Sequence, residues 1–133
     1  MEKLNLMGVW IREFPLWEGQ LLTDTTEPAL HSCGLFPMGT KLLHRKEDVL
    51  GNTRCRYADS FRLRRRAVKS PEAAAWIMAF ADWAQSSTPP AFGENTHLAV
   101  ENGKMVSTAP DGTAIYELTV TITYEKEYEH GKN

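Results

Sequence analysis

The stretch that decides the fold is residues 53–68, TRCRYADSFRLRRRAV. Over most of its length, apolar side chains occupy the odd positions and arginines the even positions. Successive side chains of a β-strand point to opposite faces of a sheet, so this alternation predicts a strand with one buried face and one basic face. The apolar positions are Cys55, Tyr57, Phe61, Leu63 and Ala67, and the basic positions are Arg54, Arg56, Arg62, Arg64 and Arg66.

The segment before this strand is expected to pair with it. Residues 40–49 have the composition of a strand, and residues 50–52, Leu-Gly-Asn, follow directly. Glycine and asparagine tolerate the positive φ angles that tight turns require. Residues 40–68 are therefore predicted to form a β-hairpin.

The C-terminal part predicts further antiparallel strands. Residues 113–128 alternate apolar and polar side chains, as in a strand with one buried and one wet face. Two shorter strand-like segments, residues 98–101 and 105–108, precede it. The turn signals Asn-Gly at residues 102–103 and Asp-Gly at residues 111–112 separate the three, so we expect a three-stranded meander.

Two helices are expected beside these strands. Apolar side chains recur at helical spacing from Leu4 to Phe14, and Pro15 removes the next donor. Ser70, followed by a proline and a glutamate, is a typical helix start. A wide apolar stripe then follows, made by Trp76, Ile77, Phe80, Trp83 and Ala84. The expected fold is α+β: an antiparallel or mixed β-sheet, with a possible edge strand around residues 21–22, and two helices packed on one face.

Composition is that of an ordinary globular chain. The 133 residues fit one domain, residues 1–133, with 42% hydrophobic and 24% charged residues. A net charge of -2 argues against a general polyanion binder. Cys33 and Cys55 are too few for a disulfide framework and are interpreted as free, buried or half-buried thiols. The first ten residues have no apolar block of the kind found in signal peptides or membrane anchors, so no membrane partner is expected.

One segment has a possible catalytic interpretation. Residues 97–103, His-Leu-Ala-Val-Glu-Asn-Gly, loosely resemble the histidine base and acid-glycine pair of chloramphenicol acetyltransferases. The acid and glycine are here separated by Asn102, and a turn at Asn102-Gly103 explains the same residues. His31, His44 and His130 have no ligand-type neighbours at metal spacing. No catalytic, metal or cofactor site is predicted.

The five arginines on the even face are the strongest charge feature of the chain. Like charges on one face repel, so something negative should lie near them. Acids of the same chain such as Glu117 and Glu125, acids of a neighbouring subunit, and DNA phosphates are the three candidates. Contact with a neighbouring subunit is the favoured interpretation and DNA is less favoured. The chain also has four tryptophans, and Trp10 or Trp17 is expected at a subunit contact.

The chain as a whole resembles a known family. The matching features are Phe14-Pro15-Leu16-Trp17 after a short helix, the segment from residue 38 to 66, the helix with Phe80-Ala81-Asp82-Trp83, and the C-terminal stretch from residue 102 to 128. Together they resemble small prophage proteins of Gram-positive bacteria, described as minor capsid or tail-completion proteins and similar in size and layout to phage tail terminators.

This resemblance implies a virion structural protein and no enzyme. Tail terminators close into hexameric rings that meet tail-tube and head-connector proteins, so the expected location is the host cytoplasm during assembly and then the virion. No catalytic residue is carried over. The alternative, from a different class, is a small enzyme or ligand-binding domain, for example an acyltransferase-like protein built around His97.

Overall fold

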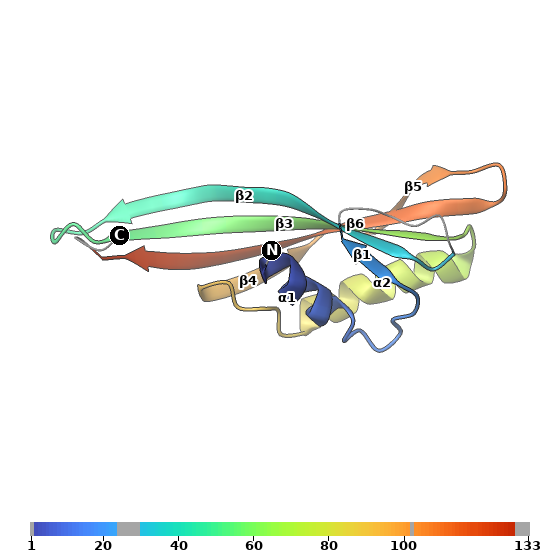
Figure 1. Ribbon diagram of the computed structural model, residues 1–133, viewed down its shortest axis with the longest axis horizontal. Helices are drawn as coiled ribbons and strands as arrows, with labels where there is room; N and C mark the ends of the chain where they lie inside the picture. Colours follow the sequence, from blue (N-terminus) through green and yellow to red (C-terminus); the bar gives the residue numbers. More distant parts are fainter. Residues whose placement is uncertain (1, 24–29, 102, 130–133) are drawn as a thin grey trace.

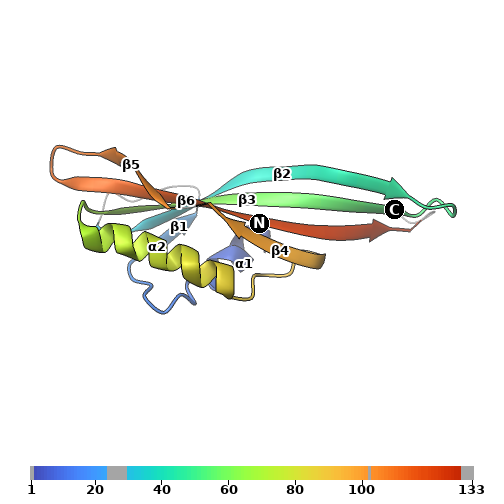
Figure 2. The same cartoon turned by 180° about the vertical axis from the view of Figure 1, so that it is seen from behind.

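The computed structural model describes residues 2–23, 30–101 and 103–129. It has two helices and a six-stranded, mostly antiparallel sheet in the order β1-β2-β3-β6-β4, in which β5 also pairs with β6. Both helices lie on the same face of the sheet (Figures 1 and 2). The α+β class predicted from the sequence is therefore confirmed. The elements are α1 (Glu2–Ile11), β1 (Leu21–Thr23), β2 (Cys33–Glu47), β3 (Thr53–Val68), α2 (Pro71–Ser86), β4 (Glu94–Val100), β5 (Lys104–Thr108) and β6 (Thr113–Tyr128).

The predicted hairpin is formed by β2 and β3, and β3 is the central strand. It pairs with β6 over its whole length without a register shift. Strand β2 begins at Cys33, seven residues before the expected start, so that boundary was wrong. Within the added part of β2, Pro37 and Gly39 lie at a β-bulge. The bulge is tolerated because β1 covers β2 only from Cys33 to Leu35.

The expected meander is wrong in its connectivity. Strands β4 and β5 both run antiparallel to β6, one after the other along the edge that β3 leaves free. They therefore form an interrupted edge strand and no hairpin with each other. Asn102 lies outside the described residues. A Cβ atom on Gly103 would lie 2.6 Å from Cγ1 of Ile77, so this glycine is needed where the edge strand approaches α2.

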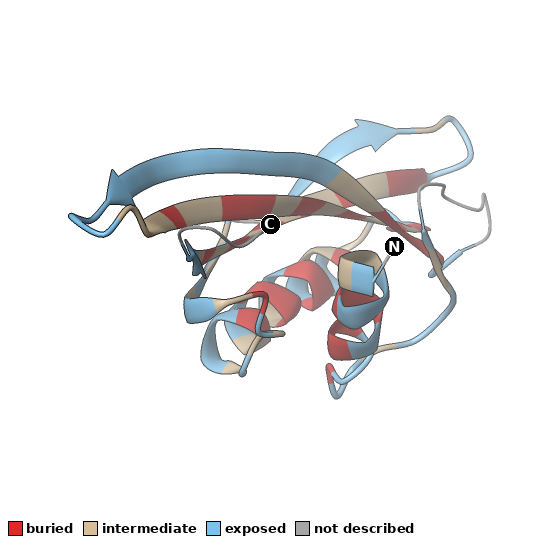
Figure 3. Cartoon of the chain, turned by 60° about the vertical axis from the view of Figure 1, so that its left-hand side comes forward, coloured by how far each residue is buried: buried red, intermediate tan, exposed pale blue. Residues whose placement is uncertain are grey.

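The core lies between the helices and the near face of the sheet (Figure 3). Helix α2 begins as predicted, with the Ser70 hydroxyl accepting a hydrogen bond from the N–H of Ala73 at 3.1 Å. Trp10 of α1 is only 4% exposed and stacks on Trp83, with ring centroids 5.2 Å apart. Trp10 therefore lies in the core, and of the two tryptophans considered for a subunit contact Trp17 remains the candidate. Trp17 is half-buried against Trp76.

One end of the sheet continues beyond both helices as an exposed arm (Figure 1). We call this arm the ribbon and define it as residues 38–57 together with residues 124–128. Its outer strand is exposed along its whole length from Met38 to Glu47. At about 3.3 Å per residue, Thr53 to Tyr57 of β3 span roughly 17 Å, so the tip of the ribbon projects beyond the core, whereas its base at Tyr124 belongs to the core.

Candidate interaction surfaces

The arginines singled out in the sequence all lie on β3 and share the open face of the sheet, which the helices do not cover. The register brings acids opposite them on β6: Arg54 pairs with Glu127, Arg56 with Glu125 and Arg64 with Glu117. Cross-strand partners project on the same face of a sheet. The alternation read from the sequence thus places the arginines as predicted.

Acids of the same chain lie at ion-pair distance from all five arginines. Glu117 is shared, since its two carboxylate oxygens lie 3.3 Å from Nε of Arg62 and 3.1 Å from Nε of Arg64. Glu125 is shared in the same way by Nε of Arg54, at 2.8 Å, and Nη1 of Arg56, at 3.3 Å. The remaining pairs are Arg54 with Glu94 and Glu127, and Arg66 with Asp111.

These contacts balance much of the positive charge on the open face. Hydrogen bonds from Asn95 and Arg54 hold the pKa of Glu125 below its ordinary value, so this acid is ionised at neutral pH. The pairs lie at the surface with partly exposed partners, and surface ion pairs are worth about 0–1 kcal/mol each. The first of the three candidate partners is therefore present in the folded chain, whereas contact with a neighbouring subunit or with DNA stays a prediction.

A sixth arginine on β3 was missed and lies on the opposite face. The side chain of Arg65 is 3% exposed, its Nη2 lies 2.8 Å from Oε1 of Glu18, and its guanidinium stacks 3.8 Å from the ring centroid of Trp76. The sequence contained a signal for this burial, because the odd positions of β3 face the core and Arg65 is at an odd position. Arg65 fastens the segment after α1 to the sheet and to α2, which makes it a structural residue.

A second missed cluster joins α1 to the sheet. Nζ of Lys3 lies 2.8 Å from Oδ2 of Asp59 and donates to the Tyr124 hydroxyl at 2.7 Å, while the hydroxyl of Thr40 donates to Oδ1 of Asp59. Desolvation raises the pKa of Asp59, but the hydrogen bonds from Lys3 and Thr40 outweigh it and leave this pKa below its ordinary value. Because these bonds occupy both carboxylate oxygens, we interpret the cluster as an anchor.

The residues considered for chemistry remain apart. His97 is exposed on the edge strand β4 opposite Thr123, whereas a general base must be held against its substrate by a fixed partner. Cys33 is fully buried, and desolvation raises the pKa of its thiol to about 11. Within the described ranges no three His, Cys, Asp or Glu side chains are grouped to hold a metal ion. His130 lies outside those ranges.

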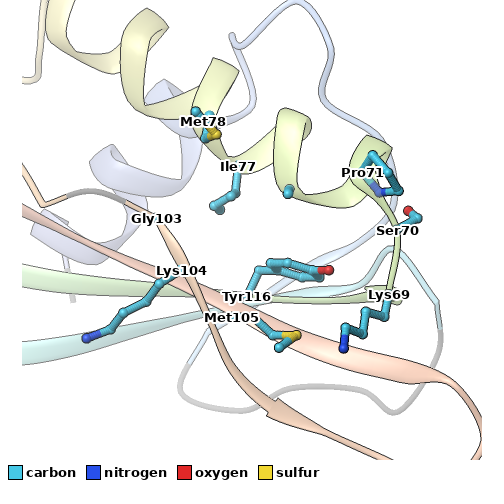
Figure 4. Close-up of a pocket in the computed structure, with 10 residues that line it drawn as sticks. Lys69, Ser70, Pro71, Ile77, Met78, Gly103, Lys104, Met105 and Tyr116 are labelled. Carbon is cyan, nitrogen blue, oxygen red and sulfur yellow. The ribbon is translucent and has the colours of Figure 1, made fainter.

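An apolar groove of about 540 Å³ lies between the N-terminal half of α2 and the β5–β6 hairpin (Figure 4). Its floor is formed by the buried side chains of Ile77 and Tyr116, and its walls by Met78 of α2 and Met105 of β5. Met78 is 61% exposed and Met105 is 41% exposed. In Figure 4, Lys69 and Lys104 lie on the two sides of Met105. The sequence did not predict this groove, since α2 and β5 are brought together only by the fold.

The tip of the ribbon is the second exposed apolar feature. Val49 is fully exposed and Leu50 is 73% exposed. Both sit in a turn fixed by Asp48, whose Oδ1 accepts hydrogen bonds from the N–H groups of Leu50 and Asn52, each at 2.9 Å. The turn therefore holds two large apolar side chains in water in a defined conformation.

Neither a scan against protein-family models nor a search of curated proteins finds a match. Neither helix in the described part of the chain has the length and the apolar run needed to span a bilayer.

Proposed function

We propose that this chain is a structural subunit of a phage particle, a tail terminator or another head-tail joining or minor capsid component, which acts by assembling into a ring. The observation that carries the proposal is the ribbon. It exposes several large apolar side chains, Leu42 and Leu43 along its outer strand and Val49 and Leu50 at its tip. Exposed apolar groups on a projecting element are suited to binding other proteins.

The character of the remaining surface supports the same function. The open face of the sheet consists of arginines and acids in exposed ion pairs, and the candidate base His97 stands exposed on an edge strand. A subunit that works by shape needs rigid surfaces and uncovered strand edges, whereas an enzyme needs converging side chains in a pocket. The resemblance of the sequence to tail-completion proteins points in the same direction.

The test uses the phage encoded by the strain that carries the gene. Particles released after induction are purified and searched for this protein by mass spectrometry, and the gene is deleted. We expect the protein in the particles, and unjoined heads and tails in electron micrographs of the deletion strain. Normal particles from the deletion strain, or particles without the protein, would refute the proposal.

A matched pair of complementing genes separates the structural function from an enzymatic one. The wild-type gene and the His97→Ala variant are each returned to the deletion strain. Both are expected to restore joined particles, because the His97 side chain is exposed and lies outside the core. Failure of a folded His97→Ala protein to restore them would favour the acyltransferase-like alternative.

A further inference from the structure

Two exposed apolar features of this chain lie toward opposite ends of the molecule. The turn at Val49 and Leu50 ends the ribbon at one extremity, and the groove between α2 and β5 lies toward the other (Figures 1 and 4). A single chain therefore cannot bring its own tip into its own groove. Two copies can meet in this way, and each then retains one free tip or one free groove.

The tip is preorganised for binding. Besides the side-chain bonds of Asp48, the turn is closed by hydrogen bonds from the N–H of Asp48 to the carbonyl of Asn52, at 2.9 Å, and from the N–H of Gly51 to the carbonyl of Asp48, at 3.1 Å. Gly51 has a φ of 86°, a conformation that glycine adopts without strain. A turn already fixed in the bound form loses little conformational entropy on association.

The groove suits two aliphatic side chains. Its volume of about 540 Å³ lies in the range of pockets that hold small organic ligands. Its floor is fixed by Ile77 and Tyr116, which are 1% and 4% exposed. Met78 and Met105 supply the exposed walls, and methionine adapts its shape to a partner because it is unbranched and polarizable.

The charges adjacent to the apolar side chains differ in sign at the two features, with Arg45 and Lys46 lying further back along β2 behind the acids of the tip. Glu47 and Asp48 precede Val49 and are exposed at the tip, whereas Lys69 and Lys104 line the groove. Apolar groups flanked by acids would thus meet apolar groups flanked by lysines. Such complementarity favours one orientation and speeds association.

We propose that the tip of one copy, Val49 and Leu50, binds in the α2–β5 groove of a second copy and joins subunits head to tail. This inference rests on the proposed function, since it supplies the contact that a ring of identical subunits requires. The contact is heterologous, so repetition produces a closed ring or an open filament instead of a twofold dimer.

Two double variants test the contact from its two sides. The tip variant is Val49→Ser with Leu50→Ser, and the groove variant is Met78→Glu with Met105→Glu. All four side chains are exposed, so both variants should fold. In sedimentation velocity over a wide concentration range, wild type is expected to self-associate, whereas each variant alone is expected to remain monomeric.

Mixing the two variants provides the decisive measurement. The tip variant has an intact groove and the groove variant has an intact tip, so an equimolar mixture contains one functional pair. We expect a heterodimer and no larger species. The control is Val9→Ser with Leu16→Ser, which removes two side chains of similar exposure elsewhere and should associate like wild type.

The charged rim gives a second readout. Glu47→Lys and Lys69→Glu are each expected to weaken self-association several-fold, and their combination in one chain should restore it at least partly. Monomeric wild type at every concentration, variants that associate like wild type, or a mixture that forms no heterodimer would each overturn the tip-in-groove contact. The proposed function is tested separately by the protein's presence in particles, so either proposal can fail while the other stands.

Discussion

Replacing Lys3 by methionine is expected to destabilise the protein more than replacing its partner Asp59 by asparagine. The two side chains are unequally buried, since the side chain of Asp59 is 3% exposed and that of Lys3 is 33% exposed. Without Lys3, a buried carboxylate loses its counter-charge and keeps the hydrogen bond from Thr40. Without the charge of Asp59, the lysine can turn its ammonium group toward water.

The burial of each partner sets the expected magnitudes. Removing one partner of a buried ion pair costs about 3–5 kcal/mol, so we expect Lys3→Met to lower the free energy of unfolding by about 3–4 kcal/mol at pH 7. Asparagine keeps one oxygen acceptor, so Asp59→Asn removes only part of the interaction. A hydrogen bond to a charged group is worth about 1.5–3 kcal/mol, and we therefore expect Asp59→Asn to lower the free energy of unfolding by about 2 kcal/mol. The double variant should lose less than the sum of the two.

The pH dependence follows from the directions of the two pKa shifts. The pKa of Asp59 is lowered in the folded chain, so its contribution is complete above the ordinary value of about 4 and is lost as pH falls through the folded pKa. Desolvation lowers the pKa of Lys3, but its bonds to Asp59 and Tyr124 leave it raised. Lys3 therefore contributes its full share of the free energy of unfolding below its ordinary pKa of about 10.4, and this share is lost as the pH rises through the pKa of Lys3 in the folded chain.

Urea unfolding followed by tryptophan fluorescence measures these differences. The difference in free energy of unfolding between wild type and Asp59→Asn should be constant from about pH 5 to pH 9 and should disappear in acid. Lys41→Met, at an exposed lysine of β2, is the control and should lie within about 0.5 kcal/mol of wild type. Equal losses for the two variants at pH 7, or a gap that persists in strong acid, would refute the reasoning.

Three further outcomes test other parts of the structure. Gly103→Ala should cost about 1–3 kcal/mol in urea unfolding, because the new methyl group would overlap Ile77; a variant as stable as wild type would contradict this packing. Arg62→Gln with Arg64→Gln should cost about 0–1 kcal/mol per pair in urea unfolding, and sedimentation of the folded variant tests the predicted subunit contact, which loss of self-association would support and unchanged self-association would contradict. Cys33 should resist iodoacetamide at pH 8 in the native protein, as read by peptide mass spectrometry, because burial raises its thiol pKa to about 11; rapid labelling would argue against its burial.

Elements whose signals are local could be predicted from the sequence. The alternation in residues 53–68 and 113–128 determines both faces of β3 and β6, and the capping serine at residue 70 marks the start of α2. In each case one short stretch contains the physical cause, which is either side-chain period or satisfaction of terminal N–H groups.

Features that depend on distant contacts could not be predicted. Asn-Gly is a strong hairpin signal, yet Gly103 serves close packing against Ile77, which is 26 residues earlier in the chain. The bulge at Pro37 requires knowing that β1 ends its pairing at Leu35. The groove between α2 and β5 also depends on distant contacts, because the two elements become neighbours only when β4 and β5 pair with the same edge of β6.

The continuity of β3 and β6 determines what a contact at the ribbon tip can do. These two strands pair over sixteen positions without a register shift, and the same strands line the core and form the ribbon. Register shifts occur in the neighbouring pairings, where β2 pairs with β3 near Pro37 and Leu42 and where β4 and β5 pair with β6, and they leave the central β3–β6 pair regular. Three hydrogen-bonded strands also hold together where an isolated two-stranded hairpin would be only marginally stable. A partner that holds the tip therefore also orients the groove at the other end, and this rigid coupling is what a repeating head-to-tail contact needs to close into a ring of defined size.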